Sequence, residues 1–343
     1  MKYLGLLFMI ILMIGCDISK DAKIDELFTN YTGNYPGASI MIIEDGAPAV
    51  IKSYGLADLE NQSPVTPESN FRLASLTKQF TAMSIMLLVK ENKLQLSDNI
   101  TGIFPDFPDY GKEITIQHLL QHTSGLIDYE DWIPDTASQQ VYDRDVEAMM
   151  MQVDSTYFKP GTEYRYSNPA YAMLVQIIEK VSGLSYSSFL KNNIFIPLEM
   201  TESVAFVKGQ NQVANRAFGY HVTADSIVFS DQSITSAVLG DGGIYSSVTD
   251  LYKWDQALYT EKLLPRKLFD QYIEAGIGGY GFGWRIDDFN GYYRMSHTGS
   301  TCGFRNVIQR YPDQKLTIII LTNRREPDVE PLANKIAKLY LSK

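Results

Sequence analysis

Cysteine is almost absent from this sequence: among 343 residues there are only Cys16 and Cys302. A small secreted domain stapled by disulfides needs several cysteines, and two cannot supply such a framework. The core therefore has to hold together by burying apolar side chains. With 45% hydrophobic residues in a chain of this length, one large domain or two interleaved lobes can do so.

Clusters of lysine and arginine are missing as well. The chain has 30 basic and 40 acidic residues, which gives a formal net charge of −10 at pH 7. Proteins that follow a phosphate backbone depend on basic patches that release counterions on binding. We therefore expect no nucleic-acid partner and a solvated acidic surface.

Near the N-terminus there is an apolar run, but it is too short to cross a bilayer comfortably. The segment YLGLLFMIILMIG follows Lys2, stops at Cys16 and fits an export signal. A cysteine at this place resembles the lipobox of bacterial lipoproteins, although Met13 stands where leucine is usual. The resemblance implies a lipoprotein signal peptide at 1–15, lipid attachment at Cys16, a tether at 16–24, and a lipid-anchored location in the bacterial cell envelope, in the periplasm or on the outer surface. The alternative is a plain signal peptide that happens to contain cysteine.

Strand and helix patterns alternate along the rest of the chain. A helical segment at 21–33 precedes ASIMIIEDGAPAVIKSYG, which has the pattern of two strands around a turn. Helices are expected in ITIQHLLQHTSG, AYAMLVQIIEKVSG and SYSSFLKNNIF, and Ser247 with Asp250 predicts a capping box before another helix. Strand patterns return in YYRMSHTG, FRNVIQRY and KLTIIILTN, and an amphipathic helix ends the chain.

These patterns predict an α+β fold, an α/β sandwich in which an antiparallel sheet is built from both chain ends and flanked by helices. A mostly helical lobe at about 95–240 is inserted between the α/β parts 25–94 and 241–343, so that 25–343 form one domain. The segment from Leu73 to about Glu91 is apolar on nearly every side after Lys78, which is typical of a helix in the core. A site is expected in the cleft between the lobes.

At the start of that buried helix stands the pattern S-x-x-K, formed by Ser75 and Lys78. A serine hydroxyl is a poor nucleophile unless a base takes its proton, and residues three apart on a helix share a face. The helix N-terminus also directs backbone N–H groups toward a developing oxyanion. The same pattern recurs as Ser188 and Lys191, in a helix that looks like an ordinary surface element, and the pair alone does not decide between them.

Tyr166 and Asn168 form the only Y-x-N in a chain with 22 tyrosines. Tyrosine can relay a proton, and asparagine can donate to a carbonyl while it accepts from an ammonium group. The structural alternative is a tyrosine that closes a turn over the core before the Asn-Pro dipeptide.

The third pattern is His297, Thr298 and Gly299, at the end of a predicted strand. Glycine allows the strand backbone to approach a ligand closely. The N–H of the next residue, Ser300, can then complete an oxyanion hole with the N–H of Ser75. A turn at a sheet edge that happens to contain histidine is the alternative.

In their order and spacing, the three patterns resemble the serine β-lactamase and penicillin-recognising hydrolase superfamily, in particular its class C β-lactamase-like branch. The segments ITIQHLLQHTSGL, FKPGTEYRYSN, LGDGGIYSSVTDLYKW and YGFGW extend the resemblance over nearly all of the chain after residue 24. On this evidence Ser75 is favoured over Ser188 as the nucleophile.

The resemblance implies a role for each matching residue. Ser75 would be the acylated nucleophile, Lys78 its proton acceptor or electrostatic partner, and Tyr166 the general base, while Asn168 would orient Lys78 and the substrate carbonyl. His297, Thr298, Gly299 and Ser300 would bind substrate. Because His297 stands where many β-lactamases and penicillin-binding proteins have lysine, the motif is similar to that of esterase and D-aminopeptidase members.

Other chemistry is weakly indicated or excluded. His118 and His122 lie four apart, but no nearby carboxylate completes a zinc motif, so we expect no metal and no cofactor. The pattern G-x-S-x-G is absent, which argues against an α/β-hydrolase. If Cys16 carries lipid, Cys302 has no disulfide partner and is expected to be a small buried packing residue.

The sequence therefore predicts a lipid-anchored serine hydrolase that forms an acyl-enzyme on a small-molecule ester, amide or peptide-like substrate. The alternative from another class is a catalytically silent penicillin-binding-like lipoprotein that binds cell-wall peptides or a partner. Efficient β-lactamase activity is a narrower possibility, since resistance needs fast deacylation.

Overall fold

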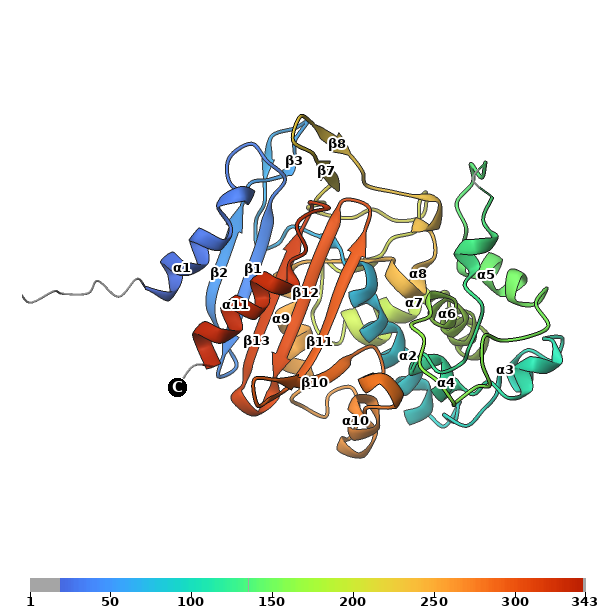
Figure 1. Ribbon diagram of the computed structural model, residues 1–343. Helices are drawn as coiled ribbons and strands as arrows, with labels where there is room; N and C mark the ends of the chain where they lie inside the picture. Colours follow the sequence, from blue (N-terminus) through green and yellow to red (C-terminus); the bar gives the residue numbers. More distant parts are fainter. Residues whose placement is uncertain (1–18, 135, 342–343) are drawn as a thin grey trace, which may run out of the picture.

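A six-stranded antiparallel sheet forms the centre of the molecule (Figure 1). The computed structural model describes residues 19–134 and 136–341. The sheet joins the two ends of the described chain, because its strand order is β10-β11-β12-β13-β1-β2. The strands are β1 (Ala38–Glu44), β2 (Ala47–Tyr54), β10 (Arg285–Phe289), β11 (Tyr292–Thr301), β12 (Phe304–Tyr311) and β13 (Leu316–Thr322).

Both faces of this sheet are buried, which explains the continuous apolar runs in its central strands. In β1, Ile40 and Ile42 face one hydrophobic cluster, whereas Met41 and Ile43 face the other. The first cluster lies under the two terminal helices, α1 (Lys20–Leu27) and α11 (Glu330–Leu341), which pack against each other on one face (Figure 1). The opposite face contacts α9 (Val248–Ala257) and the larger core.

The mostly helical lobe lies beside this sheet and is inserted between its first two strands and its last four (Figure 1). The fold is therefore α+β, as the sequence predicts. The remaining helices are α2 (Lys78–Lys90), α3 (Ile100–Ile103), α4 (Ile116–Leu120), α5 (Asp143–Met150), α6 (Asn168–Ser182), α7 (Tyr186–Leu190), α8 (Leu239–Gly242) and α10 (Arg266–Ile273). Short strands are β3 (Leu56–Asp58), β4 (Ser63–Pro64), β5 (Phe71–Arg72), β6 (Val204–Ala205), β7 (Tyr220–Val222), β8 (Ile227–Phe229) and β9 (Ile244–Ser246).

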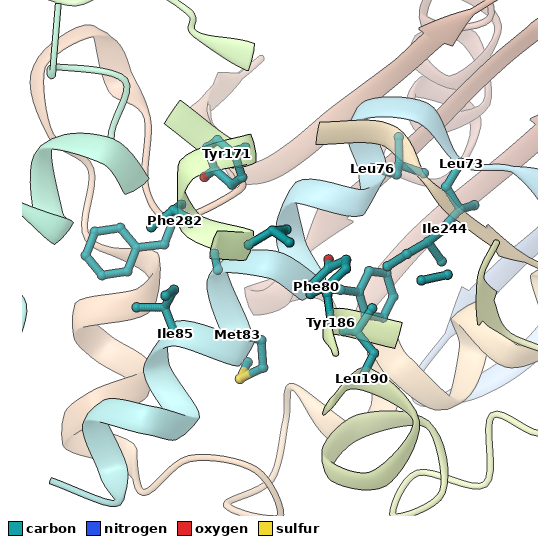
Figure 2. Packing of buried hydrophobic residues seen from close by; sticks show 14 of the residues in the cluster. Leu73, Leu76, Phe80, Met83, Ile85, Tyr171, Tyr186, Leu190, Ile244 and Phe282 are labelled. Atoms are coloured by element: carbon teal, nitrogen blue, oxygen red, sulfur yellow. The ribbon is translucent and has the colours of Figure 1, made fainter. Parts of the chain in front are cut away.

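Helix α2 runs through the larger core and has buried residues on all sides. Figure 2 shows Phe80, Met83 and Ile85 of this helix among side chains from α6, α7 and β9. Every residue from Lys78 to Leu88 is buried. The sequence prediction of a core helix is therefore confirmed, and the helix brings its N-terminal end to the junction of sheet and lobe.

Three local predictions need correction. The segment expected to be helical from Leu73 begins as a 3₁₀ turn, Ala74–Thr77, before α2 starts. The segment SYSSFLKNNIF is α7 followed by a π-helical turn, Lys191–Phe195. The capping box before α9 is only half formed: the Ser247 hydroxyl accepts the Asp250 N–H, but the Asp250 carboxylate accepts N–H groups from the loop after α7 instead.

Candidate active site

Ser75 lies in the 3₁₀ turn that leads into α2. Its neighbour Ala74 has a left-handed backbone, with φ at 50°, which a residue with a side chain adopts at a cost. The turn is held from behind by the Leu73 N–H, which donates to the Ile244 carbonyl at 2.8 Å. Ser75 is the only residue from Phe71 to Phe80 that is not fully buried. The turn thus presents one hydroxyl to the surface from an otherwise closed segment.

Lys78 is completely buried, and its ammonium group has three acceptors. Nζ lies 3.2 Å from the Ser75 hydroxyl, 3.0 Å from Oδ1 of Asn168 and 3.0 Å from the backbone carbonyl of Asp241. An ammonium group has three N–H donors, so this set matches its capacity. Within the described chain no carboxylate lies at ion-pair distance from Lys78. The lysine is therefore fixed by three neutral groups, one of which is the predicted nucleophile.

The Y-x-N segment reaches the same point from the start of α6. Ser167 caps this helix by accepting the Ala170 N–H, and Pro169 occupies its first turn. This places the Asn168 amide between Lys78 and Glu130, whose Oε1 accepts from Nδ2 at 3.3 Å. The structure thus brings two distant sequence patterns to one ammonium group.

Tyr166 lies against the same lysine. Nζ of Lys78 is 4.9 Å from the centre of the Tyr166 ring, and the Arg285 guanidinium is 5.7 Å from it. The Tyr166 hydroxyl is buried and has no hydrogen-bond partner. Buried hydroxyls are normally paired, and an unpaired one at a candidate site is a functional signal.

His297 on β11 is enclosed by protein. Its Nδ1 lies 2.7 Å from the Thr298 carbonyl oxygen, which can only accept, so Nδ1 carries the proton. Nε2 is then free to accept the hydroxyl of Tyr280 at 2.8 Å. The ring is 1% exposed, and burial together with the Lys78 charge lowers the pKa of His297 to about 3. His297 is thus a neutral group whose two nitrogens are already used, and a direct contact with substrate stays a prediction.

Gly299 allows a close approach, but the neighbour is the protein's own backbone. A β-carbon on Gly299 would lie 2.1 Å from the Leu73 carbonyl oxygen, so only glycine fits there. The pairing with β10 reaches only as far as Ser296, so within the described chain the edge of β11 from His297 to Thr301 has no strand beside it on that side. This edge therefore lies directly against the Ser75 turn.

A small polar cavity of about 80 Å³ opens beside Ser75. Its lining residues come from β5, the Ser75 turn, the 129–132 turn, α6, the 234–236 turn, α8 and the end of β11: Arg72, Ala74, Ser75, Glu130, Asn168, Thr235, Asp241, Gly242, Ser300 and Thr301. Nearly all of them offer a polar side chain. The cavity is suited to a small polar group rather than to a large apolar one.

Two carboxylates of this cavity were not foreseen from the sequence. Burial raises the pKa of the Asp241 side chain to about 6, against the opposing charges of Lys78 and Arg72. Partial burial and the neighbouring Asp128 raise the pKa of Glu130 as well. Tyr280, the partner of His297, was also missed, although it lies in the YGFGW segment that the family resemblance had indicated.

The second S-x-x-K pair does not form a comparable site. The Ser188 hydroxyl accepts from Ser185 in the cap of α7, and no hydrogen bond joins it to Lys191. The pair borders a surface hollow of about 510 Å³, and a neighbouring one of about 530 Å³ is lined by 206–218. Both are larger than the Ser75 cavity, but neither contains a hydroxyl paired with a cation. The size of a cavity therefore does not identify the candidate active site in this protein.

The two histidines four residues apart serve backbone caps. Nδ1 of His118 accepts the Thr115 N–H, and Nδ1 of His122 accepts the Ser167 N–H. Residues 19–134 and 136–341 contain no group of three or more His, Cys, Asp or Glu side chains that could hold a metal ion. His122 instead packs 4.3 Å from the Tyr166 ring, measured between ring centres.

Cys302 was expected to be buried, and this is wrong. It is partly exposed in the tight turn between β11 and β12, with φ at 41°. Its sulfur lies 4.0 Å from the Ser236 hydroxyl and 3.8 Å from that of Thr301. The sequence pattern did not reveal that the strand ends one residue before it.

Because His297 is buried, we expect the stability of the protein to depend on pH. Its pKa is lower in the folded than in the unfolded protein, so between pH 6.5 and about 3 only the unfolded chain takes up a proton. We expect the difference in unfolding free energy between wild type and His297→Gln to be constant above pH 6.5. Below it, the difference should shrink by roughly 1.4 kcal/mol per pH unit. Denaturant titrations at several pH values measure this, and a constant difference down to pH 4 would contradict it.

Comparison with known proteins agrees with this geometry. Residues 24–341 match the sequence model of the Beta-lactamase family. Penicillin-binding protein 4* of Bacillus subtilis is 33% identical over 309 residues, which cover 84% of this chain and 68% of that protein. The chain spans about two thirds of the length of the curated relatives it matches.

Solved structures share the fold over almost the whole chain. An octameric penicillin-binding protein homologue from Pyrococcus abyssi superposes with a TM-score of 0.81 at 28% identity, covering 94% of this chain and 77% of that one. D-amino acid amidase from Ochrobactrum anthropi superposes with a TM-score of 0.79 at 24% identity, covering 94% and 97%. This protein therefore belongs to the Beta-lactamase family, within the superfamily of serine β-lactamases and penicillin-binding proteins.

Proposed function

We propose that the protein is a serine hydrolase that acts through an acyl-enzyme on an ester or amide, with Ser75 as nucleophile. The observation that carries the proposal is the ammonium group of Lys78, which contacts the Ser75 hydroxyl and the Asn168 amide from a fully buried position. A serine hydroxyl held against a buried cation, which is itself oriented by an amide, is an arrangement suited to nucleophilic catalysis.

Acylation follows from this arrangement. Oγ of Ser75 attacks the substrate carbonyl carbon while its proton passes to the oxygen of Tyr166, which acts as general base in its deprotonated form. Lys78 donates to Ser75 and stays protonated, so that it serves as the electrostatic partner of the nucleophile. The N–H groups of Ser75 and Ser300 bind the oxyanion. The bond from carbon to the leaving oxygen or nitrogen then breaks, and the leaving group takes up the proton that came from Ser75.

In deacylation, water takes the place of Ser75 as the attacking nucleophile. A water molecule attacks the ester carbon of the acyl-enzyme, the proton of water passes to Tyr166, and Ser75 regains its hydroxyl as the acid is released. Lys78 and Arg285 lie beside the Tyr166 ring in both steps. Asn168 holds Lys78 in place and is available to the substrate amide or ester.

The charges around the cavity favour particular substrates. Two carboxyl side chains, Glu130 and Asp241, line it with one guanidinium, that of Arg72, and His297 adds no positive charge at neutral pH. A substrate that presents an ammonium or a neutral polar group beside the reacting carbonyl is therefore favoured over one that presents a carboxylate there. This supports short esters and D-configured or peptide-like amides over β-lactams as substrates.

Glu130→Gln tests this charge preference. The change keeps the shape and the contact with Asn168 but removes one negative charge from the cavity. We expect kcat/KM for an amine-bearing substrate such as D-alanine p-nitroanilide to fall about 10-fold, while that for its N-acetylated form changes less than about 2-fold. Equal changes for both compounds would contradict a role for Glu130 in charge selection.

The alternative function is a catalytically silent protein that uses this cavity to bind cell-wall peptides or a partner. One observation favours it: the Tyr166 hydroxyl makes no hydrogen bond to Ser75 or Lys78. A panel of short-chain esters, D-alanyl peptides and a chromogenic cephalosporin, tested on protein that lacks residues 1–16, separates the two. Turnover of an ester or peptide supports the hydrolase, and binding without turnover supports the silent protein.

We also propose the domain limits and location that the sequence predicts. The hydrolase domain would be 25–343, with a signal peptide at 1–15 and a lipidated tether at 16–24 that holds the protein to the cell envelope. Cys16 lies outside the described residues. Within the described part of the chain, no helix has the length and apolar character needed to cross a membrane. Incorporation of labelled palmitate into wild type but not into Cys16→Ala tests the lipid anchor.

A further inference from the structure

Helix α8 supplies one of the three acceptors of Lys78, although it has only four residues. The backbone carbonyl of Asp241 in this helix lies 3.0 Å from Nζ of Lys78. The other acceptors, Ser75 and Asn168, are side chains that can rotate, whereas the Asp241 carbonyl is rigid backbone. Its position therefore depends on how α8 as a whole is held.

The N-terminus of α8 is held by a carboxylate from the helical lobe. Oδ2 of Asp143 accepts the Leu239 N–H at 2.8 Å, and Oδ1 accepts the Gly240 N–H at 3.0 Å. Asp143 begins α5 and is 5% exposed. The first N–H groups of a helix have no partner within it, and here one carboxylate satisfies two of them from outside.

Other contacts fix how closely α8 packs against its neighbours. A β-carbon on Gly240 would lie 2.3 Å from the Tyr171 carbonyl oxygen, so α8 packs against α6 without an intervening side chain. The Gly240 carbonyl accepts the Thr81 hydroxyl at 2.8 Å, which ties α8 to α2. These contacts set the distance between α8 and its neighbours, but Asp143 alone pairs with the N–H groups at its start.

We propose that Asp143 is a positioning residue of the active site, which fixes α8 so that the Asp241 carbonyl meets the Lys78 ammonium group. Asp143 itself touches no reacting atom. It acts through two backbone hydrogen bonds, one short helix and one carbonyl. The inference rests on the proposed function, in which Lys78 serves Ser75.

The chain offers a matched control in Asp250. This aspartate is 1% exposed, and its Oδ2 also accepts two backbone N–H groups, those of Glu202 and Ser203, both at 3.0 Å. It additionally accepts the Ser203 hydroxyl and pairs with Lys253 at 2.9 Å. It belongs to α9 and contacts neither α8 nor Lys78. Replacement of either aspartate by asparagine removes a buried carboxylate from a backbone cap, but only Asp143→Asn affects α8.

The experiment compares Asp143→Asn and Asp250→Asn with wild type. We expect Asp250→Asn to lose at least as much thermal stability as Asp143→Asn, because it also gives up the ion pair with Lys253. Asp143→Asn should lower kcat for a short-chain ester 10- to 100-fold with KM changed less than about 3-fold, since a misplacement near 1 Å has effects of that size. Asp250→Asn should keep kcat within about 3-fold. Equal losses of kcat in the two variants would overturn the proposal.

A crystal structure of Asp143→Asn gives a readout that does not need activity. A Lys78 Nζ to Asp241 carbonyl distance clearly longer than 3.0 Å supports the proposal, and an unchanged distance overturns it. If wild type itself fails to acylate Ser75, the proposed function fails, and this distance still decides the role of Asp143. If Asp143→Asn does not fold, Asp143→Ser, with one acceptor oxygen and a smaller side chain, is measured in its place by the same criteria.

Discussion

Replacing Ser75 with alanine is expected to abolish ester hydrolysis, with a loss of about 10⁴-fold or more in kcat. In the proposed mechanism this hydroxyl becomes acylated, and without it no covalent intermediate can form. Folding should be almost unaffected, because the Ser75 hydroxyl has a single protein partner, Lys78, and the residue is partly exposed. Initial rates with p-nitrophenyl acetate and a thermal melt measure both effects.

Ser188→Ala is the matched control for this prediction. Ser188 heads the second S-x-x-K pattern of the chain, and its hydroxyl takes part only in the cap of α7. We expect hydrolysis by Ser188→Ala to equal that of wild type within about 2-fold. Full activity in Ser75→Ala, or its loss in Ser188→Ala, would show that the nucleophile has been misplaced.

Tyr166→Phe has the second largest expected effect. The change removes a buried hydroxyl that has no hydrogen-bond partner, so stability should stay the same within about 1 kcal/mol or rise. Activity should nevertheless fall about 10²- to 10⁴-fold, the range of general acid–base catalysis. A large loss of activity without loss of stability would identify the hydroxyl as a chemical rather than a structural group.

Tyr164→Phe is the control that separates a chemical role of the Tyr166 hydroxyl from an effect of the aromatic packing around it. Tyr164 also has a buried hydroxyl without a hydrogen-bond partner, and its ring lies 6.1 Å from that of His122, which packs on Tyr166 as well. We expect Tyr164→Phe to keep kcat within about 3-fold of wild type. If the two variants lose activity equally, the effect comes from the aromatic packing, and the role of Tyr166 as a base is refuted.

The architecture was predictable because its signals are local. Apolar runs in β1 and β13 indicate strands buried on both faces, and the all-round apolar α2 indicates a core helix. The motifs S-x-x-K, Y-x-N and H-T-G could also be found from the sequence, because each consists of residues that are close together in the chain. That S-x-x-K and Y-x-N meet at Lys78 could be expected only through the family resemblance, because spacing alone does not bring residues 90 positions apart together.

The supporting groups of the site could not be predicted in this way. The left-handed Ala74 belongs to a residue type that rarely adopts this conformation, so no residue signal marks it. Tyr280 reaches His297 on β11 from the loop between the 277–279 turn and β10, and Glu130 enters the cavity from a turn that has no motif. Asp143 caps a helix 96 positions further on, a contact that only tertiary structure creates.

The most direct test of the central claim is the location of a covalent adduct. Protein that lacks residues 1–16 is treated with a fluorophosphonate, its intact mass is measured, and the labelled peptide is sequenced. A single adduct on Ser75 is the predicted result. The absence of any adduct, or an adduct on Ser188 instead, would contradict the account.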